Sequence, residues 1–198
     1  WKSLRDLPTS RLFDDIGVAY MHSEITKPDT NVRLEFRSSP YGAYSHAHAD
    51  QNSFNIIASN RPLIVDSGYY DAYGSAHHKK WSTQTKAHNT ILVDGSGQNR
   101  QGSHDTRGYG RIIHFLDTDN VTYVMGSAGT AYTDVELNRF DRHLVWLKGT
   151  DVQTYIIIDD IEAADSLTHH FDWMLHASKR MFIDQKNRTV ILDNGNTH

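Results

Sequence analysis

The stretch NVRLEFRS, residues 31–38, decides the fold class, because apolar and charged residues alternate along it with a period of two. Successive side chains of a β-strand point to opposite faces of its sheet. The two sets would therefore lie on opposite faces, Val32, Leu34 and Phe36 on one and Arg33, Glu35 and Arg37 on the other. The pattern predicts a strand with one buried face and one solvated face.

Comparable short runs follow along the chain, rich in Ile, Val, Tyr and Phe: NSFNIIAS, RPLIVDSG, NTILVDG, GRIIHFLDT, NVTYVMGS, FDRHLVWLK, VQTYIIIDDI, LTHHFDWML, RMFID and RTVIL. The connections SNRP, DTDN, KGTD and QKNR are typical of hairpin turns. No segment shows a sustained helical period. We therefore predict an all-β fold, an antiparallel β-sandwich of about a dozen strands with few short helices, in which residues 1–198 form one domain.

Composition excludes several classes of partner. With 198 residues, 38% apolar and 22% charged, the chain can bury the core of a globular domain. The formal net charge is −4 and no run of Lys and Arg exceeds two residues, which argues against nucleic acid as a partner. No apolar run approaches the roughly 20 residues of a membrane helix. Because the chain has no Cys, any metal site must use His, carboxylate and water.

The longest stretch without strand character is GYYDAYGSAHHKKWSTQTK, residues 68–86. Loops of this length inside a compact domain are usually functional or disordered, and the aromatic and His content favours function. His77 and His78 precede Lys79 and Lys80, so this segment could form a positive lip for an acidic sugar or simply a solvated surface.

The motif YSHAHADQNSF, residues 44–54, places His46 and His48 two residues apart. On a strand both imidazoles would face the same side, where they could share a metal, combine one ligand with one catalytic group, or remain solvated. Asp66 ends one apolar strand and His88 opens another. If these strands are adjacent, His48, Asp66 and His88 would make an N/O ligand set that zinc accepts.

Three elements in order carry a family resemblance: SSPYGAYSHAHADQNSF at 38–54, PLIVDSGYY at 62–70 and QTKAHNTILVDG at 84–95. Together they resemble the C-terminal β-domain of the heparinase II/III-like polysaccharide lyases, which include oligo-alginate lyases. GTAY at 129–132 and Arg142 continue the pattern more weakly. The resemblance implies cleavage beside a uronic acid by β-elimination.

The same resemblance implies roles for individual residues. His48, Asp66 and His88 would bind a structural zinc, while His46 would face the substrate. A Tyr of the 68–86 loop would donate a proton. Tyr73 is the closest match, although a one-residue gap leaves Tyr69 and Tyr70 open. In the same loop, Tyr69, Tyr70, His77 and His78 are the candidate substrate-binding residues.

The family pairs this β-domain with an N-terminal α/α toroid, and the active site lies between the two. We therefore expect the chain to be the C-terminal fragment of a longer lyase, with half an active site and no activity of its own. The expected partners are the toroid and an acidic polysaccharide, with a homodimer also possible, in the periplasm or outside the cell. Heparan, alginate and hyaluronan all satisfy the same elimination chemistry.

Two other interpretations remain open at this point. One is a non-catalytic carbohydrate-binding sandwich. The other is a cupin-like metalloenzyme, which predicts a Glu a few residues after the HxH motif. The segment HAHADQNSFN offers Asp50 but no Glu, which weighs against a cupin-like site.

Overall fold

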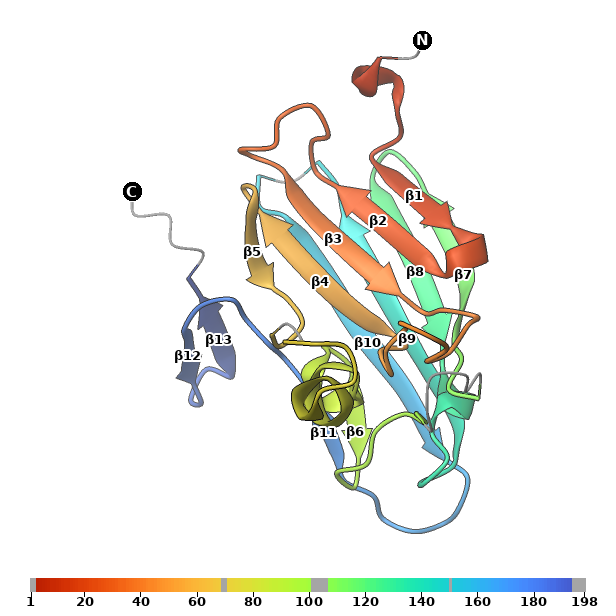
Figure 1. The fold of residues 1–198 in the computed structure, drawn as a ribbon. Coiled ribbons are helices and arrows are strands. Elements are labelled where there is room, and N and C mark those ends of the chain that lie inside the picture. The colour runs from red at the N-terminus through yellow and green to blue at the C-terminus, as the bar shows by residue number, and fades with distance from the viewer. Residues whose placement is uncertain (1–2, 69–70, 101–106, 150, 194–198) are drawn as a thin grey trace.

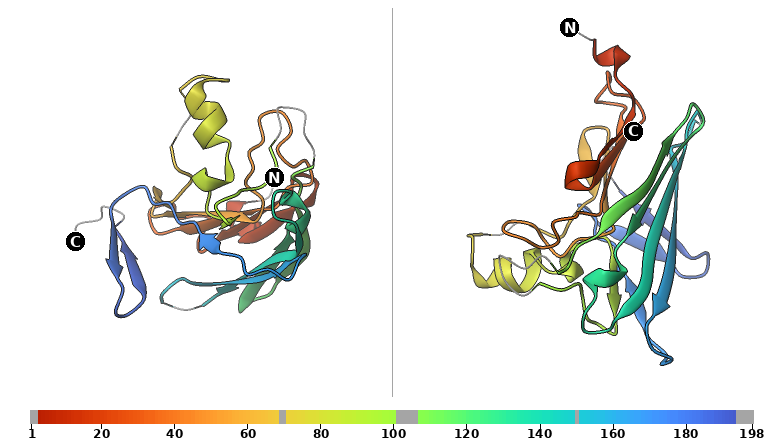
Figure 2. Two further views of the ribbon diagram at one scale, coloured as in Figure 1. Left: turned by 90° about the horizontal axis from the view of Figure 1, so that it is seen from below. Right: turned by 90° about the vertical axis from the view of Figure 1, so that its right-hand side faces the viewer.

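Two antiparallel sheets dominate the computed structural model, which describes residues 3–68, 71–100, 107–149 and 151–193. The first sheet runs in the order β1 (Ser10–Phe13), β2 (Val18–His22), β3 (Val32–Arg37), β4 (Ser53–Ala58) and β5 (Arg61–Ile64). The second has the order β10 (Thr154–Ala163), β9 (Leu137–Leu147), β8 (Val121–Ser127) and β7 (Arg111–Asp117). Figure 1 shows the two sheets one behind the other, and the right view of Figure 2 shows them face to face.

The alternating segment that opened the analysis forms β3 as predicted. Leu34 and Phe36 are fully buried, whereas Arg33, Glu35 and Arg37 on the other face are half-buried. The strand pairs with β2 on one side and β4 on the other, both antiparallel. Period-two alternation thus places one face of the strand in the core, and the predicted β-sandwich is confirmed.

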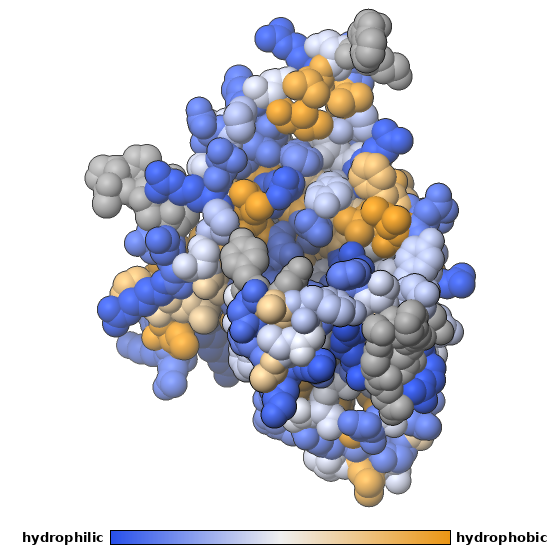
Figure 3. Space-filling model, viewed as in Figure 1, coloured by the Kyte–Doolittle hydropathy of each residue, from blue (hydrophilic) through white to orange (hydrophobic). Residues whose placement is uncertain are grey.

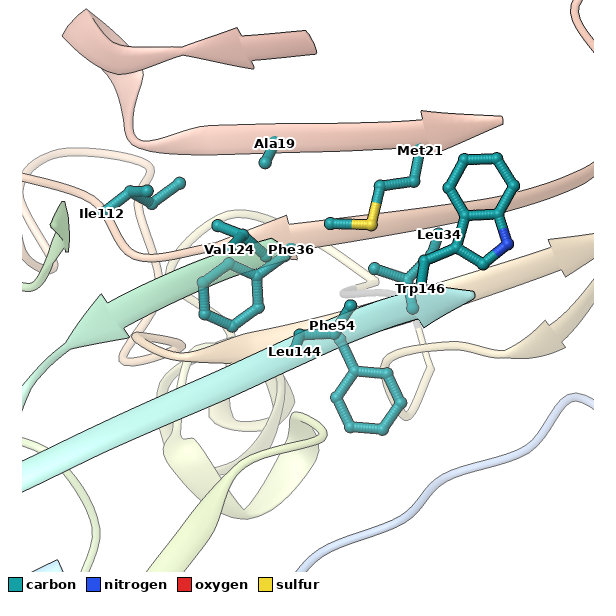
Figure 4. Packing of buried hydrophobic residues seen from close by; sticks show 9 residues of the cluster. All are labelled: Ala19, Met21, Leu34, Phe36, Phe54, Ile112, Val124, Leu144 and Trp146. Atoms are coloured by element: carbon teal, nitrogen blue, oxygen red, sulfur yellow. The ribbon is translucent and has the colours of Figure 1, made fainter. Parts of the chain in front are cut away.

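The main core fills the space between the two sheets. One cluster combines inward residues of both: Ala19, Met21, Leu34, Phe36, Phe54, Ile112, Val124, Leu144 and Trp146. In Figure 4 these side chains point toward one another from facing strands. Burial of such apolar surface is the dominant favourable contribution to folding and holds the two sheets together.

Smaller elements complete the structure. A two-stranded sheet joins β6 (Ile91–Val93) to β11 (Phe171–Trp173), and a hairpin joins β12 (Met181–Asp184) to β13 (Thr189–Leu192). The helical turns are η1 (Leu4–Asp6), η2 (Asp14–Ile16), η3 (His78–Ser82), η4 (Thr85–Ala87) and η5 (Gly129–Ala131). Within the described residues, none of the helices is long and apolar enough to cross a membrane.

The four predicted turns are confirmed, because each joins two paired antiparallel strands: β4 to β5, β7 to β8, β9 to β10 and β12 to β13. Ser59 and Asn60 in the first turn have φ of 52° and 59°, and Arg188 in the last has 53°. Left-handed backbone of this kind is typical of tight hairpin turns.

Arg142 on β9 connects the sheets to the loops that precede β4 and β6. Its side chain is fully buried and forms a bidentate ion pair with Asp159 of β10, at 2.6 and 2.8 Å. Nη1 also donates to the backbone carbonyls of Asn52 and Asn89, at 2.7 and 2.9 Å. Since Asn89 follows His88 directly and Asn52 lies four residues after His48, this cation anchors both histidine-bearing segments.

Candidate active site and metal centre

Three loop segments form the candidate site: residues 39–52 before β4, residues 65–68 and 71–77 after β5, and residues 78–90 before β6. Backbone hydrogen bonds join them, from the amide of Ala49 to the carbonyl of Thr83 at 3.0 Å and from Ser67 to Ala87 at 2.8 Å. The indole of Trp81 donates to the carbonyl of Ser67 at 3.0 Å. The left view of Figure 2 shows η3 and its flanking turns standing out from the sheets.

The expectation that His46 and His48 lie on a strand is wrong. Both residues belong to the loop between β3 and β4. Ser45 has a left-handed φ of 55°, and the amide of Ala47 donates to the carbonyl of Tyr44 at 2.9 Å, which closes a turn. The turn separates the two imidazoles, so His46 is exposed while His48 is half-buried.

The structure brings His48, Asp66 and His88 to one pocket of about 540 Å³. Oδ1 of Asp66 lies 3.1 Å from Nδ1 of His88, and the rings of His48 and His88 are 5.1 Å apart. The three residues come from three different loops. The side chain of His88 is only 1% exposed and that of Asp66 is 38% exposed, so His88 is the buried end of the group and Asp66 lies nearer the solvent.

Polar atoms at this centre are suited to a cation. Oδ1 of Asp66 and both ring nitrogens of His88 are buried and make no hydrogen bond of ordinary geometry, although Oδ1 lies 3.1 Å from Nδ1 of His88. Buried groups of this kind normally find a partner. Burial, and then the neighbouring His88, lower the pKa of His48 to about 4. His48 is therefore neutral at pH 7, the form that ligates metals.

Asp50 supplies a second carboxylate at the same place. Among the described residues, ligand atoms of His48, Asp50 and His88 lie within 4.8 Å of one another. Asp50 is buried and pairs with Nε of Arg37, which lies 3.1 Å from Oδ2. Two carboxylates are thus near enough to join His48 and His88 in a metal site, and the predicted ligand set of His48, Asp66 and His88 stays a prediction.

Tyr73 lies between two histidines. Its ring centroid is 4.9 Å from that of His46 and 4.9 Å from that of His78. Tyr73 is 55% exposed and His46 is also exposed, so both can reach a ligand. His78 is buried instead, and its Nδ1 accepts from the amide of Gly74 at 3.1 Å. His78 therefore supports Tyr73 from inside the loop.

The other predicted loop residues are placed differently. His77 is exposed at the start of η3. Tyr69 and Tyr70 lie outside the described residues. Arg100 was missed by the sequence analysis, yet it lines a second pocket of about 380 Å³ together with Tyr73. No spacing pattern connects Arg100 with the 68–86 loop, since only the tertiary fold brings the two together.

The fold and the site define the class, a β-sandwich domain with a candidate metal centre beside an exposed Tyr–His pair. A family model described as heparinase II/III-like, C-terminal, matches residues 5–197, and the chain belongs to this family. The predicted family is thereby confirmed. No curated protein matches the chain.

Solved structures with the same fold include the heparan sulfate lyase HepC from Pedobacter heparinus, with a TM-score of 0.61 and 19% identity over 77% of this chain. A heparinase III, the BT4657 gene product, has a TM-score of 0.62 and 18% identity over 79% of this chain. The chain spans 22% of the length of each of these proteins. At such identities the likeness shows a shared fold.

Proposed function

We propose that this chain is the β-sandwich part of a polysaccharide lyase that cleaves uronic-acid-containing glycans by β-elimination. The observation that carries the proposal is the contact between the exposed rings of Tyr73 and His46, on the two loops that also carry His48 and Asp66. Membership of the heparinase II/III-like family and the fold shared with lyases of heparan sulfate support it.

The elimination needs two proton transfers. The C5–H bond of the uronate breaks, its electron pair forms the C4–C5 double bond, and the C4–O4 bond breaks. In our proposal the neutral imidazole of His46 accepts the C5 proton and the phenol of Tyr73 protonates O4. A proton then passes from the imidazolium to the phenolate, whose ring centroids lie 4.9 Å apart, and both side chains regain their starting forms. Histidine and tyrosine suit these roles through geometry and tunable pKa.

The proposed zinc has a structural role. His48 and His88 would hold it together with Asp66, Asp50 or both, and the bound ion would join the loop before β4 to the segment before β6. His46 and Tyr73 are carried by loops that contact this centre. A bound ion would thereby help to hold the two loops that carry the reacting side chains, without contact with the sugar.

In our proposal the β-sandwich belongs to a longer protein. We infer that a second domain, an N-terminal α/α toroid, completes the substrate cleft and neutralises the uronate carboxylate as charge builds on it. Degradation of a polymer outside the cytoplasm would place the protein in the periplasm or the medium, which fractionation of the source cells can test.

Incubation of the full-length protein with heparan sulfate, alginate and hyaluronan tests the function. We expect one polymer to yield products with the ultraviolet absorbance of an unsaturated uronate at the new non-reducing end. A protein that binds one of these polymers but releases no unsaturated product is a carbohydrate-binding protein, and that result would refute the lyase proposal.

A further inference from the structure

A second pocket lies beside Tyr73. Its volume is about 380 Å³, and the described residues that line it are Tyr73, Gly74, His78, Lys79, Thr83, Gln84 and Arg100. It shares no lining residue with the pocket of His48, Asp66 and His88. In Figure 3 the surface around the η3 segment is mostly white and blue, as suits a polar ligand.

The charge of this pocket is positive. Lys79 and Arg100 both line it, and none of the described lining residues carries a carboxylate. The negative charge of Asp50 also attracts Arg100. That carboxylate is already paired with Arg37, whose Nε lies 3.1 Å from Oδ2 of Asp50. A concave surface with one sign of charge concentrates ligands of the opposite sign.

Arg100 is held in a defined position. It is half-buried, and Nη1 donates to the backbone carbonyl of Ala43 at 2.5 Å, in the loop that precedes His46. The guanidinium group has five N–H donors in a rigid fork that matches carboxylate and sulfate oxygens. A partly buried cation whose position is already fixed loses little entropy when it binds an anion.

Lys79 reaches the same pocket because of the turn at Gly74. This glycine has φ of 80°, and a Cβ placed on it would lie 4.0 Å from Nζ of Lys79. The amide of Gly74 also donates to His78, which closes the turn at the start of η3. Lys80, the next residue of the same helix, is exposed and does not line the pocket.

We propose that Lys79 and Arg100 form an anion-binding subsite next to Tyr73, which takes a carboxylate or sulfate group of an acidic sugar. The inference rests on the proposed function and deepens it. In that function this domain contributes its own cations to substrate recognition, in addition to groups from the rest of the protein. Binding of a charged group here would place the neighbouring glycosidic bond near the phenol of Tyr73.

Equilibrium binding to the full-length protein tests the subsite, with free glucuronate and inorganic sulfate as the two probes in calorimetric titrations. We expect Arg100→Gln to weaken at least one probe by roughly tenfold or more, because a charge-assisted hydrogen bond is lost. Lys79→Gln should weaken the same probe. Lys80→Gln removes the same charge outside the pocket and should leave binding unchanged.

The pattern of results identifies the anion. Weaker binding of glucuronate alone assigns a carboxylate, and weaker binding of sulfate alone assigns a sulfate group. Arg100→Lys keeps the charge and should retain part of the affinity. If Arg100→Gln does not fold, as judged by circular dichroism, Lys79→Gln decides the question.

The proposal is overturned if the wild-type protein binds neither probe, if neither substitution weakens binding, or if Lys80→Gln weakens it equally. Its failure is distinguishable from failure of the lyase function, because cleavage is measured separately on the polymers. A protein that cleaves a polymer normally after both substitutions keeps its function and lacks the subsite.

Discussion

The ring centroid of His46 lies 4.9 Å from that of Tyr73, although 27 positions separate the two residues in the sequence. Each residue is carried by a different loop, one before β4 and one after β5. Both rings are exposed. This contact joins the two residues that the sequence analysis selected as catalytic.

Substitution of either ring should remove activity without loss of the fold. In the full-length protein we expect His46→Ala and Tyr73→Phe each to lower kcat by about 10²- to 10⁴-fold, the usual contribution of a general acid or base. Zinc content and the melting temperature should stay at wild-type values. The measurement is the ultraviolet absorbance of the unsaturated product, alongside elemental analysis. Loss of zinc in His46→Ala would show that the two histidines have the opposite roles.

Removal of either proposed zinc ligand, His48 or His88, should lower stability. At a free zinc concentration about 100 times its Kd, the bound ion adds about 2.7 kcal/mol to the free energy of unfolding. We expect His48→Ala and His88→Ala to lose bound zinc and this stabilisation, as measured by elemental analysis and thermal unfolding with and without a chelator. His114→Ala is the control, since this histidine is exposed on β7. A wild-type protein without metal would contradict the prediction.

Conservative substitutions can distinguish the roles of the two carboxylates near His88 in the proposed zinc site. Oδ1 of Asp66 lies 3.1 Å from Nδ1 of His88. Ligand atoms of Asp50, His48 and His88 lie within 4.8 Å of one another, and Asp50 also pairs with Arg37. We expect Asp66→Asn to abolish zinc binding at stoichiometric zinc and Asp50→Asn to weaken it less. Equilibrium dialysis against zinc measures both. The reverse order would identify Asp50 as the ligand and Asp66 as the residue that orients His88.

The buried cation on β9 should be essential to stability. Arg142→Met leaves Asp159 without its bidentate partner, and the carbonyls of Asn52 and Asn89 lose a donor. Removal of one partner of a buried ion pair costs about 3–5 kcal/mol, which we expect in urea unfolding. Arg139→Met on the same strand is the matched control, because its pairs with Asp160 and Glu162 are exposed. Equal effects of the two substitutions would refute this role of Arg142.

His169 should contribute stability that depends on pH. Its Nδ1 and Nε2 lie 2.7 Å from Asp94 and 2.8 Å from Asp165, so the imidazole donates to both carboxylates only when it is protonated. Hydrogen bonds with Asp165 and then Asp94 raise the pKa of His169 above its usual 6.5. The pKa of Asp94 is held below 3.8 by hydrogen bonds from the backbone of His170 and from the His169 side chain. The pKa of Asp165 is likewise held below 3.8 by hydrogen bonds from the His169 side chain and the backbone of Leu167.

A raised histidine pKa stabilises the folded state fully below pH 6.5, and this stabilisation is lost as pH rises through the folded pKa. The depressed carboxyl pKa values act above pH 3.8 and lose their effect as pH falls further. We therefore expect wild type to exceed His169→Gln in unfolding free energy most between these limits, with a smaller difference at pH 9. Urea unfolding at several pH values measures this, and a difference that grows at high pH would contradict it.

Much of the fold could be predicted from local patterns. Alternation at residues 31–38 identifies a strand with Leu34 and Phe36 inward, and the turn SNRP identifies a hairpin. These features depend on side-chain direction and backbone conformation within a few residues, so the sequence carries them directly. The family motifs likewise selected His48, Asp66 and His88, which the structure brings to one pocket, and His46 and Tyr73, whose rings it brings into contact.

Only the tertiary structure decided which residues surround these motifs. Arg100 and Arg142 reach the site through contacts between segments distant in sequence, such as the bond from Arg142 to the carbonyl of Asn89. The turn at Ser45 also separates His46 from His48 in a way that strand periodicity did not predict. Local sequence determines the conformation of a strand or a turn, whereas the neighbours of a loop depend on how the whole chain packs its two sheets.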